Sequence, residues 1–343
     1  MAKRPTIADL ARHAGVSVAT VDRALNGRLP VREETAQRIF KAARAIDYHA
    51  AGLLGRQLLQ DPPQYRLGFV LLQPSQPFYA EFARELTAAV AEASGFRAHM
   101  HLDYLEGHTT SEICSKLNAA AAQSQAVALV AIDHPTVSAA VEALKEKHIP
   151  VFSLLSDFAS GVRCCYIGVD NRKAGRTAGW ALAKTAPRPG KVAVFVGSHR
   201  FHGQELREIG LRAYLRENAP GFEVVETLVS LEAREIAHEA TLDLLARHPD
   251  LVGIYVAGGG MEGAISALRE ENMAGRLALI CNEITADSRA AIADGIVTLA
   301  ISTPLRRLAR ELVALMVRAI EMGPAEVPGQ IFLPFDMHVS ENI

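Results

Sequence analysis

A glycine-rich hexapeptide is the first group of residues whose spacing suggests chemistry. Gly258, Gly260 and Gly263 form a Gly-x-Gly-x-x-Gly pattern, and Glu283 follows about 20 residues after its last glycine. Between a strand and a helix, such a loop lets the backbone approach a pyrophosphate while the acid binds a ribose hydroxyl. One interpretation of the chain is therefore an NAD-dependent oxidoreductase, which saturable binding of NAD(H) would support.

Other catalytic patterns do not accompany this loop. The sequence has no nucleophile elbow, zinc-binding helix motif, P-loop or paired catalytic carboxylates. Its four cysteines lack metal-ligand spacing and are typical of reduced thiols in a cytoplasmic protein, and its twelve histidines are scattered. The glycines also lie in the last complete βαβ unit before a late strand, whereas dehydrogenases commonly use the first. We therefore expect a protein that is not an enzyme and uses no metal or cofactor.

The N-terminal 60 residues are basic, although the whole chain has a net charge of −2. They contain ten Lys and Arg residues against five Asp and Glu, so the remaining residues are acidic overall. A basic head on an acidic body indicates that the head meets a polyanion and the body does not. A solvated, arginine-rich helical face is the alternative.

Three short helices are predicted in this head. Apolar residues recur at helical spacing over 7–14, 18–25 and 32–46. Thr6 and Ser17 are suited to cap the first two helices, and a tight glycine-containing turn joins them. This arrangement is typical of a helix-turn-helix.

The stretch from Thr6 to His49 resembles the lac-repressor (LacI) family of bacterial transcription regulators. It contains the Ala-Gly-Val-Ser entry, the Ala-Thr-Val of the second helix, the Arg-x-x-Asn ending and the tyrosine that closes the third helix. The resemblance implies a sequence-specific repressor that binds a near-palindromic double-stranded DNA operator as a homodimer. It implies that the second helix enters the major groove.

Small side chains begin that second helix. The resemblance places Val18 and Ala19 against base edges, where short apolar groups contact thymine methyls, and Arg23 where its guanidinium suits guanine. Packing is the alternative for Val18 and Ala19, and a solvated charge is the alternative for Arg23. Asp22 departs from the family pattern and repels phosphate unless it is paired. The remaining candidate DNA-binding residues are Ser17, Thr20 and Asn26, as phosphate contacts, and Thr6.

Residues 49–64 are expected to form a linker that resembles the family's hinge helix. Arg56-Gln57-Leu58 matches the Arg-Gln-Leu of that hinge, which makes Leu58 the candidate wedge into the minor groove. The spacing from Tyr48 to Arg56 is one residue longer than in the lac repressor, so Leu54 is a rival for this role.

From Tyr65 onward, apolar strands alternate with amphipathic helices. The strands are expected at 67–72, 97–102, 126–132, 151–155, 191–197, 222–228, 251–257, 277–282 and 296–302; the helices are expected at 79–94, 110–123, 136–147, 172–185, 204–218, 233–247, 262–272 and 304–322. Repeated βαβ order predicts doubly wound parallel sheets. The expected fold is thus an all-α helix-turn-helix domain over 1–48 followed by a two-lobed α/β core over 65–343.

This core resembles the type I periplasmic sugar-binding fold. The resemblance implies three chain crossings between the lobes, with one lobe at about 65–166 plus 297–330 and the other at about 167–296 plus 331–343. It implies a small-molecule effector, a carbohydrate or a related metabolite, in the cleft between them. The chain lacks an apolar run of membrane-spanning length and an N-terminal apolar signal region, so we expect no membrane association, no soluble sugar carrier and a cytoplasmic location.

Candidate effector ligands follow the predicted strands, because open α/β sheets bind at the carboxyl ends of their strands. Gln76 matches a family asparagine, and Phe78 and Tyr79 are suited either to stack on a sugar ring or to pack. Asp133 and Asp157 are suited to accept hydroxyl hydrogen bonds or to cap helices.

Arg207 matches the family arginine that reaches the ligand, with an interlobe ion pair as the alternative. Later strand ends depart from sugar-binding relatives. Gly259 lies in the glycine run that replaces an Asn-Asp, and Glu283 stands in for an aspartate. These changes leave open a smaller, differently functionalised or anionic effector.

Overall fold

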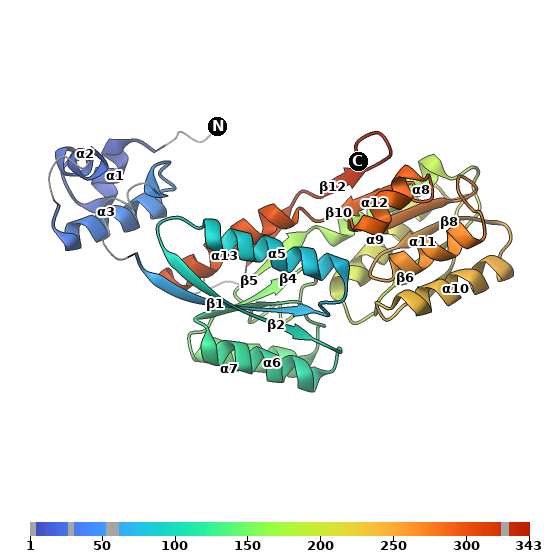
Figure 1. Cartoon of the computed structure of the whole chain (residues 1–343), viewed down its shortest axis with the longest axis horizontal. Coiled ribbons are helices and arrows are strands. Elements are labelled where there is room, and N and C mark those ends of the chain that lie inside the picture. The colour runs from blue at the N-terminus through green and yellow to red at the C-terminus, as the bar shows by residue number, and fades with distance from the viewer. Residues whose placement is uncertain (1–4, 27–30, 53–61, 324–328) are drawn as a thin grey trace. The chain divides into compact units, whose positions relative to one another are not determined.

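The computed structural model of the chain describes residues 5–26, 31–52, 62–323 and 329–343 (Figure 1). Three helices form the head, namely α1 (Ile7–Ala14), α2 (Val18–Asn26) and α3 (Glu33–Ala45). The Thr6 hydroxyl accepts a hydrogen bond from the Asp9 backbone N–H, and the Asp9 carboxylate accepts one from the Thr6 N–H. This reciprocal cap confirms Thr6 as the start signal of α1.

The head has an apolar core of its own. Leu10, Val21 and Ile39, one from each helix, are fully buried. Gly15 adopts a left-handed φ of 62° at the end of α1, a conformation that favours glycine. The Arg38 guanidinium donates hydrogen bonds to two carbonyls of this turn, at 2.8 and 2.9 Å. The turn and α3 together fix the direction in which α2 leaves the core of the head.

Six strands form the first sheet of the core, in the order β11-β5-β4-β3-β1-β2. They are β1 (Gln64–Leu72), β2 (Arg97–Leu105), β3 (Ala126–Leu129), β4 (Val151–Leu154), β5 (Cys165–Val169) and β11 (Gly329–Leu333). The helices of this lobe are α5 (Pro77–Glu92), α6 (Thr110–Gln123), α7 (Pro135–Glu146) and α13 (Leu305–Met322). In Figure 1, α5 lies above the strands while α6 and α7 lie below them, so helices cover both faces of the sheet.

The second sheet also has six strands, in the order β12-β10-β9-β8-β6-β7. They are β6 (Lys191–Val196), β7 (Glu223–Val229), β8 (Leu251–Val256), β9 (Ala278–Asn282), β10 (Leu299–Ser302) and β12 (Asp336–His338). Its helices are α8 (Asn171–Thr185), α9 (His202–Asn218), α10 (Arg234–Arg247), α11 (Met261–Glu270) and α12 (Ala286–Ala293). The pairings β7-β6-β8-β9-β10 are parallel, and only β12 runs antiparallel to its neighbour β10.

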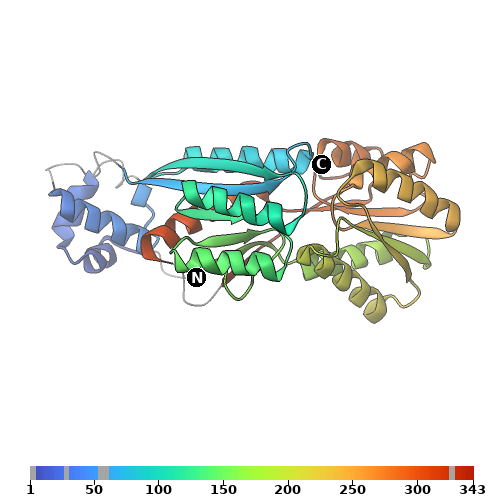
Figure 2. The ribbon, with the colours of Figure 1, turned by 90° about the horizontal axis from the view of Figure 1, so that it is seen from below.

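Successive residues of this sheet face opposite layers of helices. Val194 packs in the cluster formed with α8 and α9, whereas Phe195 packs in the cluster formed with α10, α11 and α12. Buried strands covered on both faces are what the long apolar runs in the sequence predict. The doubly wound parallel architecture is therefore confirmed, and Figure 2 shows the helical layers from a second side.

The residues at which the chain crosses between the two lobes differ from the predicted lobe boundaries. Strand β10 lies in the second sheet, although residues 297–302 were assigned to the first lobe. Strands β5 and β11 lie wholly in the first sheet, although the predicted boundaries cut through both. Each crossing occurs after the carboxyl end of a strand, because a buried strand completes its hydrogen-bond ladder before the chain leaves the sheet. The strands β5, β11 and β12 and the helix α12 were not predicted.

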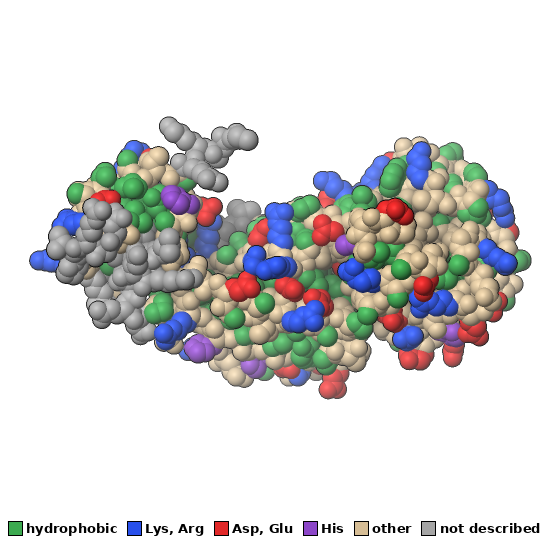
Figure 3. Space-filling model, turned by 45° about the horizontal axis from the view of Figure 1, so that its top comes forward, with side chains coloured by type: hydrophobic (Ala, Val, Ile, Leu, Met, Phe, Trp, Pro, Cys, Tyr) green, Lys and Arg blue, Asp and Glu red, His purple; other side chains and the backbone are tan. Residues whose placement is uncertain are grey.

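The described residues contain no helix that is both long and apolar enough to cross a bilayer. Figure 3 shows basic and acidic side chains interspersed over the face of the core that it presents.

Candidate functional site

The first turn of α2 is exposed, in contrast to the inner face of the same helix. Val18 is 51% exposed, and Ala19 and Arg23 are also exposed, whereas Val21 and Ala24 are buried in the head. About half of the Val18 surface is thus available for contact with another molecule. This exposure favours the contact interpretation of Val18 and Ala19 over the packing alternative.

Polar residues of the same turn are held by local hydrogen bonds. The Ser17 hydroxyl accepts from the Thr20 backbone N–H at 3.1 Å and lies 2.8 Å from the Thr20 hydroxyl. Arg23 folds back along the helix, where its Nε donates to the Ala19 carbonyl and its Nη2 to the Thr20 hydroxyl. Asn26 is the last residue of α2. The predicted wedge Leu58 and its rival Leu54 lie outside the described residues.

A cleft of about 740 Å³, counting the part open to solvent, lies at the carboxyl ends of the core strands. Elements of both lobes line it, including the start of α5, the end of β4 and the starts of α9 and α11. Six of the eight predicted effector residues lie in its wall, namely Gln76, Phe78, Tyr79, Arg207, Gly259 and Glu283.

Arg207 is buried at the base of this cleft, with 7% of its surface exposed. Its Nε donates to the Asn171 side-chain oxygen at 2.7 Å, and its Nη1 donates to the Ala257 carbonyl at 2.8 Å. Its Nη2 lies 3.7 Å from a carboxylate oxygen of Glu283. Arg207 and Glu283 belong to the same lobe, so the predicted alternative of an interlobe ion pair is wrong.

Close packing of α8 against α9 brings Arg207 to this position. A Cβ atom at Gly175 would overlap the Arg207 backbone carbonyl, and a Cβ at Gly210 would overlap the Arg172 carbonyl. Glycine at both positions lets the two helix backbones meet, so the side chain of Arg207 reaches Asn171 at the start of α8.

Glu283 follows β9 with a left-handed φ of 75° and turns its carboxylate into the site. The carboxylate accepts hydrogen bonds from the Thr303 backbone N–H and hydroxyl, both at 2.8 Å. Burial raises the pKa of Glu283, while Arg207 and the Thr303 hydrogen bonds oppose this rise. Two hydrogen bonds and the nearby Arg207 thus hold the Glu283 carboxylate in place.

Gln204 and Glu232 were missed by the sequence analysis. The Gln204 side chain accepts from the Gly197 N–H and donates to the Glu232 carboxylate, both at 2.6 Å. Glu232 has a left-handed φ of 62° in the loop between β7 and α10. The position of Glu232 in a loop after a strand was the one feature of the sequence that could have indicated a ligand-binding role, and no motif accompanies it.

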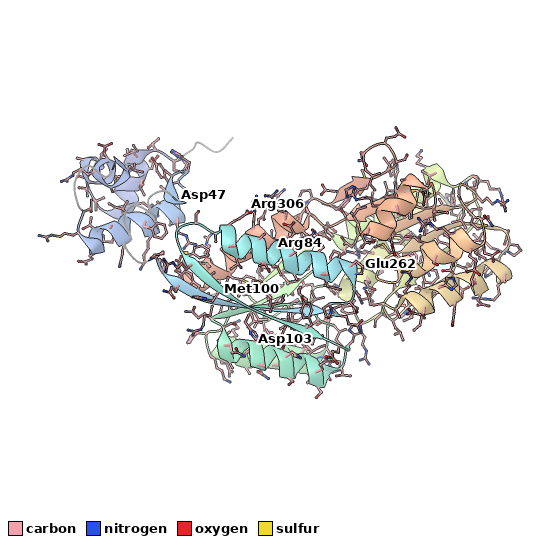
Figure 4. All side chains as sticks on the ribbon, viewed as in Figure 1. Asp47, Arg84, Met100, Asp103, Glu262 and Arg306 are labelled. Atoms are coloured by element: carbon pink, nitrogen blue, oxygen red, sulfur yellow. The ribbon has the colours of Figure 1, made fainter. Side chains whose placement is uncertain are left out.

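A third carboxylate, from Glu262, lines the cleft at the first turn of α11, where Figure 4 labels it. Burial raises the pKa of Glu262, with the nearby Asp287 adding to the rise. Its carboxylate accepts a hydrogen bond from its own backbone N–H and a long one of 3.5 Å from the Thr285 hydroxyl. Glu262 lies inside the glycine-rich hexapeptide, two residues after Gly260, and was not predicted as a ligand.

The first-lobe wall combines aromatic rings with one buried amide. Phe78 packs edge-on to Tyr79 at a centroid distance of 5.0 Å, so its ring both packs and lines the cleft. Burial raises the pKa of Tyr79 well above its usual value, with contributions from Glu232 and Glu283. The Gln76 side-chain nitrogen is buried without a hydrogen-bond partner among the described residues.

Asp133 and Asp157 do not line the cleft, contrary to prediction. Asp133 accepts a hydrogen bond from the Ala159 backbone N–H at 3.1 Å. Asp157 forms a buried two-pronged ion pair with Arg163 and also accepts from Ser153 and Gln330. Although burial opposes it, these hydrogen bonds lower the pKa of Asp157. Both side chains hold the fold together instead of facing a ligand.

The glycine run has a packing explanation. A Cβ at Gly263 would overlap the Arg234 carbonyl of α10, and one at Gly259 would overlap the Glu232 carboxylate. A pyrophosphate on this loop would meet that carboxylate, and like charges repel. No group of His, Cys, Asp and Glu residues in the described part of the chain is arranged to hold a metal ion.

Two protein families match the chain. The Periplasmic binding protein domain matches residues 67–324, and Bacterial regulatory proteins, lacI family, matches residues 6–50. Among curated proteins, the chain is 24% identical over 275 residues to the HTH-type transcriptional regulator GalS of Salmonella typhimurium, covering 78% of this chain and 76% of that protein. It is 26% identical over 272 residues to the HTH-type transcriptional regulator GntR of Pseudomonas aeruginosa, covering 78% and 75%. The oxidoreductase interpretation has no support among these relatives.

Solved structures share the fold of the core. An ABC transporter solute binding protein of Agrobacterium vitis with bound D-fucose has a TM-score of 0.74 at 18% identity, covering 81% of this chain and 96% of that one. A solute binding protein of Burkholderia graminis in complex with D-arabinose has a TM-score of 0.73 at 20% identity, covering 83% and 98%. At these identities the likeness shows the two-lobed α/β fold.

Proposed function

This chain belongs to the lacI family of bacterial regulatory proteins and carries a periplasmic-binding-protein core, and from this we propose that it is a repressor switched by a small carbohydrate effector. It is a DNA-binding transcriptional regulator, as its relatives are. The proposal concerns the effector, the assembly on DNA and the residues that carry each role.

The exposed first turn of α2 is the observation that carries the DNA-binding role. In our proposal Val18 and Ala19 contact base edges, and Arg23 reads a guanine after leaving its hydrogen bonds to its own helix. Ser17 and Thr20 are placed at the positive end of the α2 dipole, which favours phosphate contacts. Asn26 and Thr6 complete the proposed set.

The cleft supports a carbohydrate effector. Aromatic rings of Phe78 and Tyr79 offer faces to apolar patches of a sugar, and carboxylate and amide groups offer hydrogen-bond partners to hydroxyls. Relatives are named for such ligands, among them the sucrose operon repressor of Klebsiella pneumoniae, 36% identical over 94 residues that cover 26% of this chain and 28% of that protein. We propose that the site binds and releases its ligand without catalysis.

We further propose that two copies bind one near-palindromic operator in the cytoplasm, with the linker wedging Leu58 or Leu54 into the minor groove. The effector binds between the two lobes with different affinities in the DNA-bound and the free form of the protein. The ratio of these two affinities sets the strength of the switch. Either sign of coupling, induction or corepression, is consistent with the site.

Selection of bound sequences from random duplexes tests this function directly. The full-length protein should enrich a near-palindromic sequence, and the affinity for that sequence should change on addition of one monosaccharide from a broad panel. Recovery of sequences with no common element, at modest ionic strength, would contradict sequence-specific recognition.

A further inference from the structure

The charges that line the cleft do not balance. Four ionisable groups with a formal charge at neutral pH lie in its wall, namely Arg207, Glu232, Glu262 and Glu283. Arg207 pairs with Glu283, and its Nε and Nη1 donate hydrogen bonds to Asn171 and Ala257. Glu232 and Glu262 are therefore left without a cation in the wall.

Arg234 lies outside the wall and lowers the pKa of Glu262, but less than burial and Asp287 raise it. Arg234 lies at the start of α10 but pairs with Asp287, with 3.4 Å between the guanidinium and the carboxylate. The Glu232 carboxylate receives a hydrogen bond from the neutral Gln204 side chain. The Glu262 carboxylate receives one from its own backbone N–H and the long one from Thr285, both of them neutral donors. Both carboxylates are partly buried, and partial burial without a cation carries a cost because neutral donors do not cancel their charge.

On the opposite wall, the Gln76 side-chain nitrogen is a donor without a partner in the described residues. Gln76 lines the cleft, and an acceptor oxygen on a ligand there that reaches this nitrogen would satisfy it. The two walls are thus complementary to different groups on one ligand. An oxygen acceptor fits near Gln76, and a cationic donor fits near Glu232 and Glu262.

We propose that the effector carries a protonated amino group together with hydroxyl groups, as an amino sugar does, and that sugar acids and sugar phosphates are excluded. This inference rests on the proposed function, because it takes the cleft as the effector site. It opposes the anionic effector that the sequence left open, since the only cation of the wall is already paired with Glu283. An ammonium near Glu232 and Glu262 forms charge-assisted hydrogen bonds, which a neutral hydroxyl at the same place does not.

Calorimetric titration of the full-length protein with matched sugars tests the proposal. The probes are D-glucose, D-glucosamine, N-acetyl-D-glucosamine, D-glucuronate and D-glucose 6-phosphate, with the corresponding D-galactose series alongside. In at least one series the amine should bind about tenfold or more tightly than its parent sugar and its N-acetyl form. The acid and the phosphate of that series should bind more weakly than the parent.

Two variants locate the effect. Glu232→Gln and Glu262→Gln should each lower the ratio of amine to parent affinity by about tenfold, while binding of the parent sugar shows that the variant cleft is folded. Glu235→Gln is the matched control, because Glu235 is an exposed acid on the first turn of α10 that does not line the cleft. It should leave the ratio unchanged.

The outcomes separate the two proposals. Equal binding of amine and parent, or tighter binding of an acid or phosphate, overturns the amine inference and leaves a carbohydrate effector standing. An unchanged affinity ratio in both glutamate variants also overturns it. Absence of binding by every sugar of both series contradicts the carbohydrate effector itself, and the amine inference falls with it.

Discussion

Arg207 and Asn171 join the wall of the cleft to the connection between the lobes. Arg207 Nε donates to the Asn171 oxygen at 2.7 Å, and the Asn171 nitrogen donates to the Leu155 carbonyl of the first lobe at 3.0 Å. The Tyr166 hydroxyl donates to that same carbonyl at 3.2 Å and also lies 3.2 Å from the Asn171 nitrogen. A ligand that shifts Arg207 therefore acts directly on hydrogen bonds that span the lobes.

Replacement of Arg207 by lysine should show how much this geometry matters. Lysine keeps the charge, but its three donors share a single nitrogen and do not span the positions that Nε and Nη1 of Arg207 occupy, so Asn171 and Ala257 lose buried partners. We expect a loss of about 1–3 kcal/mol in the free energy of unfolding and at least about tenfold weaker effector binding. Urea unfolding and calorimetry measure the two effects.

Arg212→Lys is the matched control, because Arg212 lies on the same helix but pairs with Glu208 outside the cleft. It should change effector affinity by less than about twofold, as expected for a partly exposed pair. Equal effects of the two substitutions would assign Arg207 no particular role in binding.

Asp157→Asn should destabilise the core without acting through the effector cleft. The substitution removes the charge that balances Arg163, whose own exposure is 2%. Breaking a buried pair in this way costs about 3–5 kcal/mol. Thermal unfolding should register the loss, whereas Asp250→Asn, which breaks the exposed pair with Lys191, should cost about 0–1 kcal/mol. Similar losses for both variants would contradict this account of Asp157.

Glu262→Gln should stabilise the unliganded protein at neutral pH. Burial raises the pKa of Glu262 above its unfolded value, so the folded state resists the charged form and stability falls as pH rises through the elevated pKa. The glutamine variant escapes this loss. Its advantage in unfolding free energy should be present at pH 7 and vanish at pH values below the unfolded pKa of a glutamate. An advantage that stays constant over this range would refute a titration origin.

Arg23→Ala should weaken specific DNA binding more than non-specific binding. An arginine that reads a base contributes about 1–3 kcal/mol of discrimination. Gel-shift titration with the selected operator and a scrambled duplex, at one salt concentration, measures both affinities. Arg12→Ala, which removes another exposed arginine of the head, should lower the two affinities by the same factor. The same behaviour of Arg23→Ala would place Arg23 at a phosphate.

The spacing of apolar residues and a few local motifs made most of the fold predictable from the sequence. Helical spacing predicted all three helices of the head, and the cap at Thr6 is present as expected. Apolar runs predicted most of the central strands, because strands buried on both faces leave little room for polar residues. The buried strand β5, the edge strands β11 and β12 and the helix α12 were not predicted. Both edge strands are partly exposed and lack a continuous apolar run, and Ile292 is the one large apolar residue of α12, so no helical spacing emerges there.

The site was only partly predictable, for a different reason. Arg207 and Glu283 follow motif positions and were found, but Gln204 and Glu232 owe their place in the wall to loop conformation and to each other. Asp157 shows the converse. Its position after a strand suggested a ligand, yet its partner Arg163 lies six residues away and is itself buried, a pairing that spacing alone does not reveal.

The glycine contacts between α8 and α9 also limit how the second lobe is able to respond to a ligand. The two backbones are in contact at Gly175 and Gly210. No flexible side chains separate them there, so one helix does not slide along the other. A ligand that displaces Arg207 therefore moves α8 and α9 together as one rigid unit.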